Sequence, residues 1–211
     1  MIITKFGHCC LLVEENGLRI LTDPGIYSTS QNDAKNIDVI LITHEHADHF
    51  HIDSVKMILK NNPHVKIITN IAIATLLKKE NIQSTIIEEN EKTIEKDVSI
   101  EGIGNMHAVI YPSLPIAQNT GYFIADKFFY PGDAFTNPNR PVEILAAPMA
   151  GPWMKISEGI DYVKELKPRI CFPVHDGIYK DAGLAHRVPK MVFDPLGVQF
   201  KILEIDSPTE F

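Results

Sequence analysis

The feature that most constrains this chain is a run of four potential metal ligands placed directly after a buried strand. The run is Thr43-His44-Glu45-His46-Ala47-Asp48-His49, and it follows the apolar segment 37–42, whose pattern is typical of a strand inside a sheet. The sheet would hold these side chains rigidly while the loop leaves them open to water and substrate. Three imidazoles and one carboxylate suit zinc, and the carboxylate also tolerates manganese or iron.

Length and composition set the scale of the fold. The chain has 211 residues, of which 45% are hydrophobic and 22% charged, as in an ordinary globular protein with one core. No apolar run approaches the roughly 20 residues that cross a bilayer, and residues 1–7 lack the basic and apolar regions of a secretory signal. We therefore expect one domain over residues 1–211, a cytoplasmic location and no membrane association.

The net charge of −7 limits the kinds of partner the chain can bind, and the three cysteines indicate the state of its thiols. A negative chain has no broad basic surface for nucleic acid, although divalent ions in a cleft could still support a nuclease. Cys9, Cys10 and Cys171 are an odd number, and neighbouring cysteines rarely pair with each other, so we expect reduced, mostly buried thiols. A metal-binding role for Cys9 and Cys10 is the alternative.

Apolar periodicity predicts strands alternating with helices. The Asn16-Gly17 pair is a strong hairpin signal, and Pro24 ends the strand that follows. Asp23, just before Pro24, would either contact a metal ligand from behind or only cap the turn. The expected strands are 9–14, 18–22, 65–69, 84–87, 121–125, 127–130, 142–147, 170–174 and 198–205, with short antiparallel strands inside 93–104; the expected helices begin at Asp53, Asn70 and Ser157.

Further potential ligands follow three later strand-like segments. His107 comes after the segment 93–104, Asp133 follows Pro131-Gly132 at the end of a hairpin, and His175 follows 170–174. A site with three protein ligands would not use so many groups, whereas two ions that share one carboxylate would. The complete set of candidate ligands is His44, His46, Asp48, His49, His107, Asp133 and His175.

The order and spacing of these seven residues resemble the ligand motifs of the metallo-β-lactamase superfamily, and the resemblance covers almost the whole chain. It implies an α/β (α+β) fold, a four-layer αββα sandwich of two packed mixed β-sheets flanked by helices, with the metals at one edge. The ligand sets it implies are His44, His46 and His107 for a first ion and Asp48, His49 and His175 for a second, with Asp133 bridging both.

The resemblance also implies a metal-dependent hydrolase with two divalent ions, for which Zn²⁺ fits best and Mn²⁺ or Fe is the alternative. A dinuclear metal-bridged hydroxide would attack a small ester, lactone or phosphodiester, with Asp48 and Asp133 as catalytic residues. The alternatives are a nuclease or β-lactamase-like promiscuous hydrolase, a di-iron oxidoreductase, and a noncatalytic metal-binding protein. The di-iron variant usually has a carboxylate at one early ligand position and an added flavodoxin-like domain, whereas this chain has His46 and no such domain.

Two short motifs narrow the resemblance further. Gly7-His8-Cys9-Cys10 and Leu21-Thr22-Asp23-Pro24 resemble the branch with ascorbate-6-phosphate lactonase-like proteins and the N-acyl phosphatidylethanolamine-hydrolysing phospholipase D. Members of that branch often have Ser or Ala where this chain has Cys9. His8 would then contact a ligand or the substrate, or be an internal hydrogen-bonded histidine.

The candidate contacts for a small-molecule substrate are His8, Tyr111 in segment 108–120, and Trp153 in the loop 148–153. Trp153 would equally serve as a core residue. No pattern assigns a role to His186 or indicates an oligomeric state.

Overall fold

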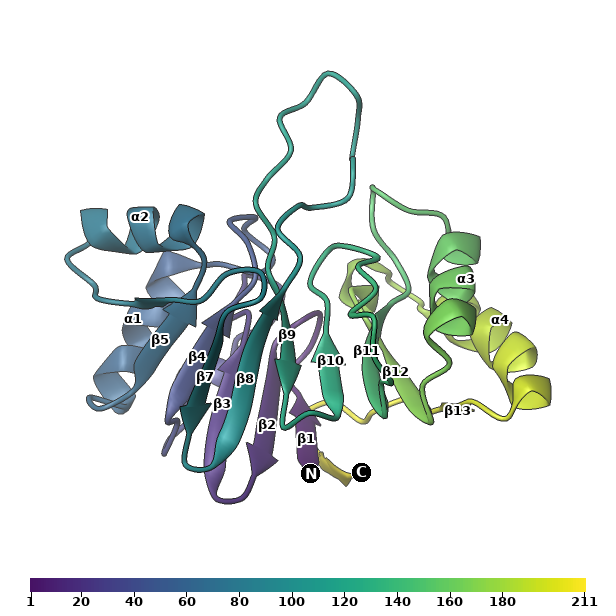
Figure 1. Ribbon diagram of the computed structural model, residues 1–211, viewed down its shortest axis with the longest axis horizontal. Coiled ribbons are helices and arrows are strands. Elements are labelled where there is room, and N and C mark those ends of the chain that lie inside the picture. Colours follow the sequence, from purple (N-terminus) through teal and green to yellow (C-terminus); the bar gives the residue numbers. More distant parts are fainter.

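The computed structural model describes residues 1–211 as two seven-stranded sheets packed face to face, with helices on both outer surfaces (Figure 1). The strand order is β14-β1-β2-β3-β4-β5-β6 in the first sheet and β13-β12-β11-β10-β9-β8-β7 in the second. This arrangement confirms the expected four-layer αββα sandwich of two mixed sheets. No helix is both long and apolar enough to span a bilayer.

The first sheet is antiparallel on one side and parallel on the other. Antiparallel pairing joins β14, β1, β2 and β3, and parallel pairing joins β3 to β6 through crossovers that contain the helices α1 and α2. Its strands are β1 (Ile2–Lys5), β2 (Leu11–Glu15), β3 (Leu18–Thr22), β4 (Val39–Ile42), β5 (Lys66–Thr69), β6 (Thr85–Ile86) and β14 (Pro208–Glu210); its helices are α1 (Ile52–Asn61) and α2 (Ile71–Lys79).

The second sheet repeats this plan. Antiparallel pairing joins β7 to β10, and parallel pairing joins β10 to β13 through crossovers that contain α3 and α4. Its strands are β7 (Lys92–Glu95), β8 (Val98–Ile103), β9 (Gly121–Ile124), β10 (Phe128–Tyr130), β11 (Ile144–Pro148), β12 (Ile170–Val174) and β13 (Gln199–Phe200); its helices are α3 (Ile156–Leu166) and α4 (Gly183–Phe193). Short 3₁₀ helices cover 30–33, 176–178 and 194–196.

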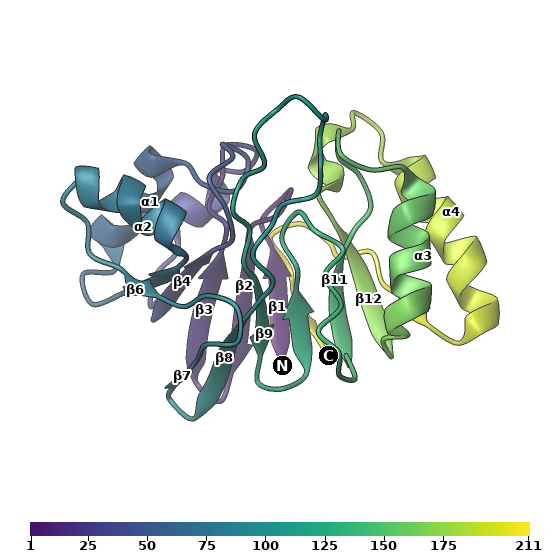
Figure 2. The same ribbon diagram turned by 45° about the horizontal axis from the view of Figure 1, so that its top comes forward.

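Apolar side chains fill three layers. The largest cluster lies between the sheets and contains Leu11 and Phe172, while Leu12 packs in a separate cluster with residues of α1 and α2. A third cluster joins the second sheet to α3 and α4, the helices at the right of Figure 2. Because successive side chains of a strand point to opposite faces, strands buried on both faces are apolar throughout, as in β4.

The predicted helix starts are right for one helix and wrong for two. Asn70 caps α2, accepting a hydrogen bond from the backbone of Ile73 at 3.1 Å. Helix α1 begins after His51, so Asp53 lies inside its first turn, where a carboxylate is favourable to the helix dipole. Helix α3 begins after Lys155, so Ser157 is not its cap.

The largest differences from expectation lie in 1–7 and beyond 182. Strand β1 and helix α4 were not predicted. Helix α4 contains Pro189 and has no side-chain cap, so its sequence has neither an uninterrupted helical pattern nor a capping residue. The strand predicted over 198–205 is reduced to β13. Residues after β13 cross to the first sheet, where β14 pairs with β1.

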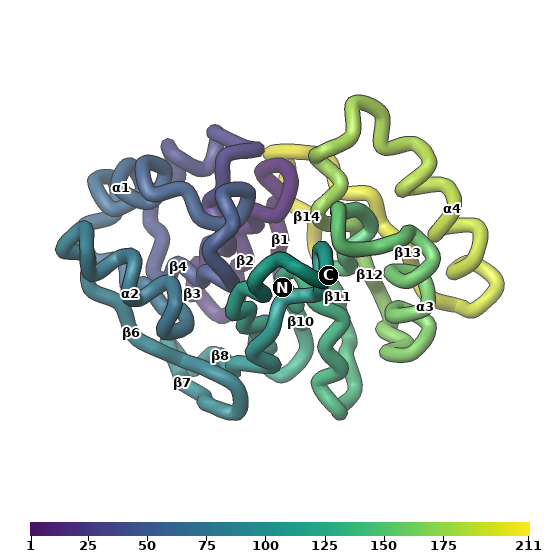
Figure 3. Tube along the Cα trace, turned by 90° about the horizontal axis from the view of Figure 1, so that it is seen from above, coloured from purple at the N-terminus to yellow at the C-terminus, as the bar shows by residue number.

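One edge of the sandwich collects the ends of strands from both sheets. Strands β8, β10, β11 and β12 run in the same direction, so their carboxyl ends meet on one side of the second sheet. The carboxyl ends of β3 and β4 and the start of β2 share an edge of the first sheet. The loop 104–120 stands above this rim as the highest segment in Figure 1, and Figure 3 looks down on it.

Candidate metal centre

All seven candidate ligands gather at this rim. Four of them lie in the loop after β4, His107 lies after β8, Asp133 after β10 and His175 after β12. Their ligand atoms form two groups, and within each group the atoms lie within 4.8 Å of one another. Strand ends that are distant in sequence therefore place these side chains together.

The first group, called the histidine cluster below, consists of His44, His46 and His107. The ring centroids lie 4.7 to 4.9 Å apart; His44 and His107 are buried and His46 is half-buried. Burial and the positive charge of His49 hold the pKa of His44 well below its usual range, and burial and His107 lower the pKa of His46. Both rings are therefore neutral at pH 7, which is the form that binds a metal.

The second group, called the carboxylate cluster below, consists of Asp48, His49, Asp133 and His175. Burial opposes protonation of His175, but the Cys9 sulfur and the carboxylates of Asp133 and Asp48 outweigh it and raise the pKa of His175 to about 10. The pKa of His49 is also raised against burial, by Cys9 and Asp133. Without an ion, this cluster is held together by buried ion pairs.

The Asp133 carboxylate belongs to the carboxylate cluster and also contacts the histidine cluster. Its Oδ2 atom is 2.9 Å from Nε2 of His175 and 3.4 Å from Nε2 of His107, and its Oδ1 atom is 3.1 Å from Nε2 of His49. Burial opposes its ionisation, but the charge of His49 and the contacts with His107 and His175 hold its pKa well below the usual range. The Trp153 indole donates a hydrogen bond of 2.8 Å to Oδ2 and fixes this orientation.

Three of the histidines are oriented by hydrogen bonds at Nδ1, while their Nε2 atoms face the site. Nδ1 of His44 bonds Thr43 Oγ1 at 2.9 Å, Nδ1 of His49 bonds Asp23 Oδ2 at 2.7 Å, and Nδ1 of His107 bonds the backbone oxygen of the next residue. Their Nε2 atoms are buried and make no hydrogen bond, although those of His49 and His107 lie 3.1 and 3.4 Å from the Asp133 carboxylate. Buried nitrogens without partners, aimed at a common point by outer hydrogen bonds, are what a divalent ion requires. The residues therefore fit a metal.

Asp23 is the partner that ties His49 to the fold. Its side chain is fully buried and accepts hydrogen bonds from the backbone and hydroxyl of Thr43 at 2.8 and 2.7 Å, and from the Tyr130 hydroxyl at 2.7 Å. Of the two roles expected for Asp23, the structure favours contact with a candidate ligand. Sequence analysis did not identify Thr43 or Tyr130 as part of this network, since nothing in their local pattern indicates it.

The proposed substrate contacts occupy different environments. His8 is buried, with Nε2 3.2 Å from Asp48 Oδ2, so it lies behind a candidate ligand. Trp153 is 8% exposed and contacts Asp133. Tyr111 is 63% exposed in the loop 104–120. Of the three, only Tyr111 presents its side chain to solvent.

His186 lies outside both clusters. Its Nε2 atom is 2.7 Å from Asp176 Oδ2, and Oδ1 of Asp176 accepts a hydrogen bond from the buried Lys5. These residues join β1, the end of β12 and α4, over sequence separations of up to 171 residues. No local pattern could have predicted this buried network.

The three cysteines are buried and unpaired, as expected. Burial raises the pKa of Cys171 to about 12 and that of Cys10 well above its usual range. Cys9 differs from both: burial opposes its ionisation, but the positive charges of His49, His8 and His175 lower its pKa to about 6.

Comparison with known proteins agrees with this geometry. The family described as "Beta-lactamase superfamily domain" matches residues 2–175. The chain belongs to the metallo-β-lactamase superfamily, as a metal-dependent hydrolase. Within the superfamily it is 33% identical to Protein Rv0786c of Mycobacterium tuberculosis, over 84% of this chain and 85% of that protein.

More distant superfamily members span the whole molecule. A Thermoplasma acidophilum protein named UPF0173 metal-dependent hydrolase is 25% identical over 97% of this chain and 96% of its own length. The solved structure of Igni18, a metallo hydrolase of Ignicoccus hospitalis, superposes with a TM-score of 0.78 at 22% identity, over 100% of this chain and 98% of that one. The structural likeness confirms the superfamily fold.

Proposed function

We propose that each cluster holds one divalent ion and that Asp133 bridges the two. The observation that carries this proposal is the position of the Asp133 carboxylate, whose Oδ2 atom lies within 3.4 Å of nitrogens from both clusters. The unpartnered Nε2 atoms of His44, His49 and His107 support it. Neutral imidazoles and carboxylates fit Zn²⁺ best, with Mn²⁺ or Fe as the alternatives.

The reaction proposed is hydrolysis of a small ester or lactone, with a phosphodiester as the alternative. Bound divalent ions would polarise the scissile carbonyl and lower the pKa of a water molecule, so that hydroxide is available near neutral pH. Asp133 would hold the two positions at a fixed separation, and the Trp153 indole keeps its carboxylate from rotating.

Asp48 would orient the attacking water. Burial opposes its ionisation, but contacts with His175 and His8 hold its pKa far below the usual range. A carboxylate with so low a pKa accepts a hydrogen bond and does not retain a proton. We therefore assign Asp48 to orientation of the nucleophile and His8, 3.2 Å from it, to positioning of Asp48.

The loop 104–120 favours a substrate with an apolar body. Val109, Tyr111 and Leu114 are each more than half exposed on this loop, which begins beside His107. Exposed apolar groups gathered beside a polar centre are typical of a binding surface. Arg140 is ion-paired with Glu101 and is not free to bind a phosphate group. An ester or lactone is therefore favoured over a phosphodiester or nucleic acid.

Elemental analysis combined with a substrate panel tests this function. Protein purified without added metal should contain about two zinc or manganese ions per chain and should hydrolyse a lactone or aryl ester in a metal-dependent manner. The same panel includes bis-p-nitrophenyl phosphate, a thioester and a β-lactam. Two irons with redox activity would favour the di-iron alternative, and a chain that takes up no metal on reconstitution would overturn the proposal.

A further inference from the structure

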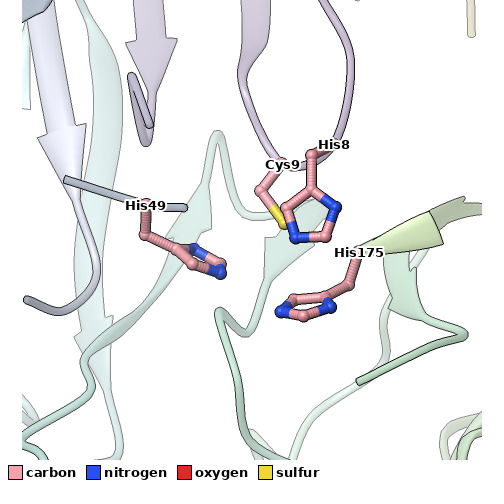
Figure 4. A group of neighbouring side chains, drawn as sticks. All are labelled: His8, Cys9, His49 and His175. Atoms are coloured by element: carbon pink, nitrogen blue, oxygen red, sulfur yellow. The ribbon is translucent and has the colours of Figure 1, made fainter. Parts of the chain in front are cut away.

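Cys9 belongs to a third group of potential ligands that overlaps the carboxylate cluster. Its sulfur and one ring nitrogen each from His8, His49 and His175 lie within 4.8 Å of one another, and all four residues are buried. Figure 4 shows the three imidazoles around the Cys9 side chain. His49 and His175 are members of both groups. These two imidazoles are therefore grouped with the Cys9 sulfur as well as with the carboxylates.

The other two cysteines provide the contrast. Cys10 packs in the apolar cluster with residues of α1 and α2, and Cys171 packs in the apolar cluster with residues of α3 and α4. Neither belongs to a group of potential ligands. Cys9 also packs in an apolar cluster, the one between the two sheets, but it is the one cysteine that belongs to a group of potential ligands as well. A buried cysteine that serves only for packing would have the surroundings of Cys10.

Two histidines of this group each have a buried ring nitrogen without a hydrogen-bond partner. Nδ1 of His8 and Nδ1 of His175 are both buried without a hydrogen-bond partner, and the two residues are only 1% and 2% exposed. The ring centroids of His8 and His175 are 4.1 Å apart. Burying a polar nitrogen without a partner is costly, so such atoms call for an explanation, which an ion among them would provide.

We propose that Cys9 is a thiolate ligand of the ion in the second position, together with His49 and His175, and that this sulfur selects a thiophilic ion such as Zn²⁺. As the metal–sulfur bond forms, the thiol releases its proton to water, and no electron transfer is involved. Sulfur ligands favour zinc over the harder manganese and magnesium ions, which prefer oxygen. The inference rests on the proposed function for the existence of a second ion, and it adds a ligand and a selectivity.

Cadmium substitution tests the sulfur contact directly. Metal-free protein loaded with Cd²⁺ should show a sulfur-to-cadmium charge-transfer absorption in the ultraviolet. The zinc-loaded protein should show a sulfur neighbour at about 2.3 Å in X-ray absorption. Cys9→Ala and Cys9→Ser should lose both signals, whereas Cys10→Ala and Cys171→Ala should retain them. The last two variants control for the loss of a buried thiol elsewhere in the core.

Selectivity provides the second measurement. In competition between Zn²⁺ and Mn²⁺, the preference of the second position for zinc should fall by at least about 10- to 100-fold in Cys9→Ala, the range that loss of a supporting group costs a metal site. Two Cd²⁺ per chain without the charge-transfer band, or a band that survives in Cys9→Ala, would overturn the inference and leave the two-ion proposal intact. A chain that binds no second ion would overturn both.

Discussion

The two clusters at the rim differ in how they are held without a metal. In the histidine cluster, burial lowers the pKa of His44 and His46, so both rings are neutral and can bind an ion directly. In the carboxylate cluster, the raised pKa of His49 and His175 and the lowered pKa of Asp133 produce buried ion pairs. The comparison indicates that His44 and His46 can bind an ion without losing a proton, whereas an ion must displace protons from His49 and His175.

The largest effect on metal content and turnover is expected for substitution of Asp133, which contacts both clusters. Asp133→Ala removes the shared carboxylate, so the chain should retain at most one ion, and turnover should fall by at least about 10²- to 10³-fold, as for loss of a key electrostatic group. Elemental analysis and kcat/KM measure both. Asp126→Ala, an exposed residue in the turn between β9 and β10, serves as the control. Full metal occupancy with undiminished turnover would contradict the bridging role.

A smaller effect, larger at the carboxylate cluster than at the histidine cluster, is expected for Asp23→Asn. The amide cannot accept the same bonds from His49 and Tyr130, so affinity for the second ion should fall by about 10- to 100-fold. Affinity for the first ion should fall less, because Asp23 reaches His44 only through the Thr43 hydroxyl. The free energy of unfolding should drop by about 1–3 kcal/mol, measured by urea denaturation. Tyr130→Phe removes only one donor and should have a weaker effect on the second ion. Equal loss of both ions would show that the clusters are not independent.

The pH dependence of metal binding separates the clusters without mutation. His175 has its pKa raised from 6.5 to about 10, so near neutral pH an ion must displace a proton from it. Affinity of the second position should therefore increase with pH up to about pH 10, by at most about tenfold per unit for each displaced proton. Calorimetry in buffers of different ionisation enthalpy counts the protons. A flat pH profile for the second ion would remove the distinction between the clusters.

The smallest effect is expected for a substitution that leaves both clusters unchanged. Tyr111→Ala shortens an exposed side chain on the loop 104–120, so metal content should be that of the native chain and KM for an apolar ester should increase roughly three- to tenfold. Met191→Ala, at a position on α4 that is 75% exposed, controls for loss of surface area. If the KM of the two variants is the same, the loop does not contact substrate.

The strand ends that carry the candidate ligands could be predicted from local pattern, whereas the four layers and the position of the site at one edge were expected from the resemblance to the superfamily. The apolar segment 37–42 followed at once by His44 places a ligand at a strand end, and the same reasoning applies to Asp133 and His175. Parallel strands bring their carboxyl ends to one edge, so the proximity of Asp133 and His175 follows from the second sheet. His44 belongs to the first sheet, so its proximity to them depends on how the two sheets pack.

The supporting contacts could not be predicted, since they depend on tertiary packing. The hydroxyl of Tyr130 reaches Asp23 across 107 residues, and no pattern around Tyr130 distinguishes it from a core aromatic residue. Cys9 and Cys10 are identical in sequence terms, yet only Cys9 faces the histidines. Helix α4 was missed because Pro189 lies within it.

Asp23 connects the retention time of an ion to the integrity of the sandwich. It follows β3 of the first sheet, bonds Tyr130 of β10 in the second, and holds His49 in place. When the sheets separate, the bond to Tyr130 breaks, and His49 of the first sheet moves away from Asp133 and His175 of the second in the same event. An ion coordinated by His49 would then be kinetically trapped for as long as the two sheets remain packed. The rate of its release would therefore report the rate at which the sheets open.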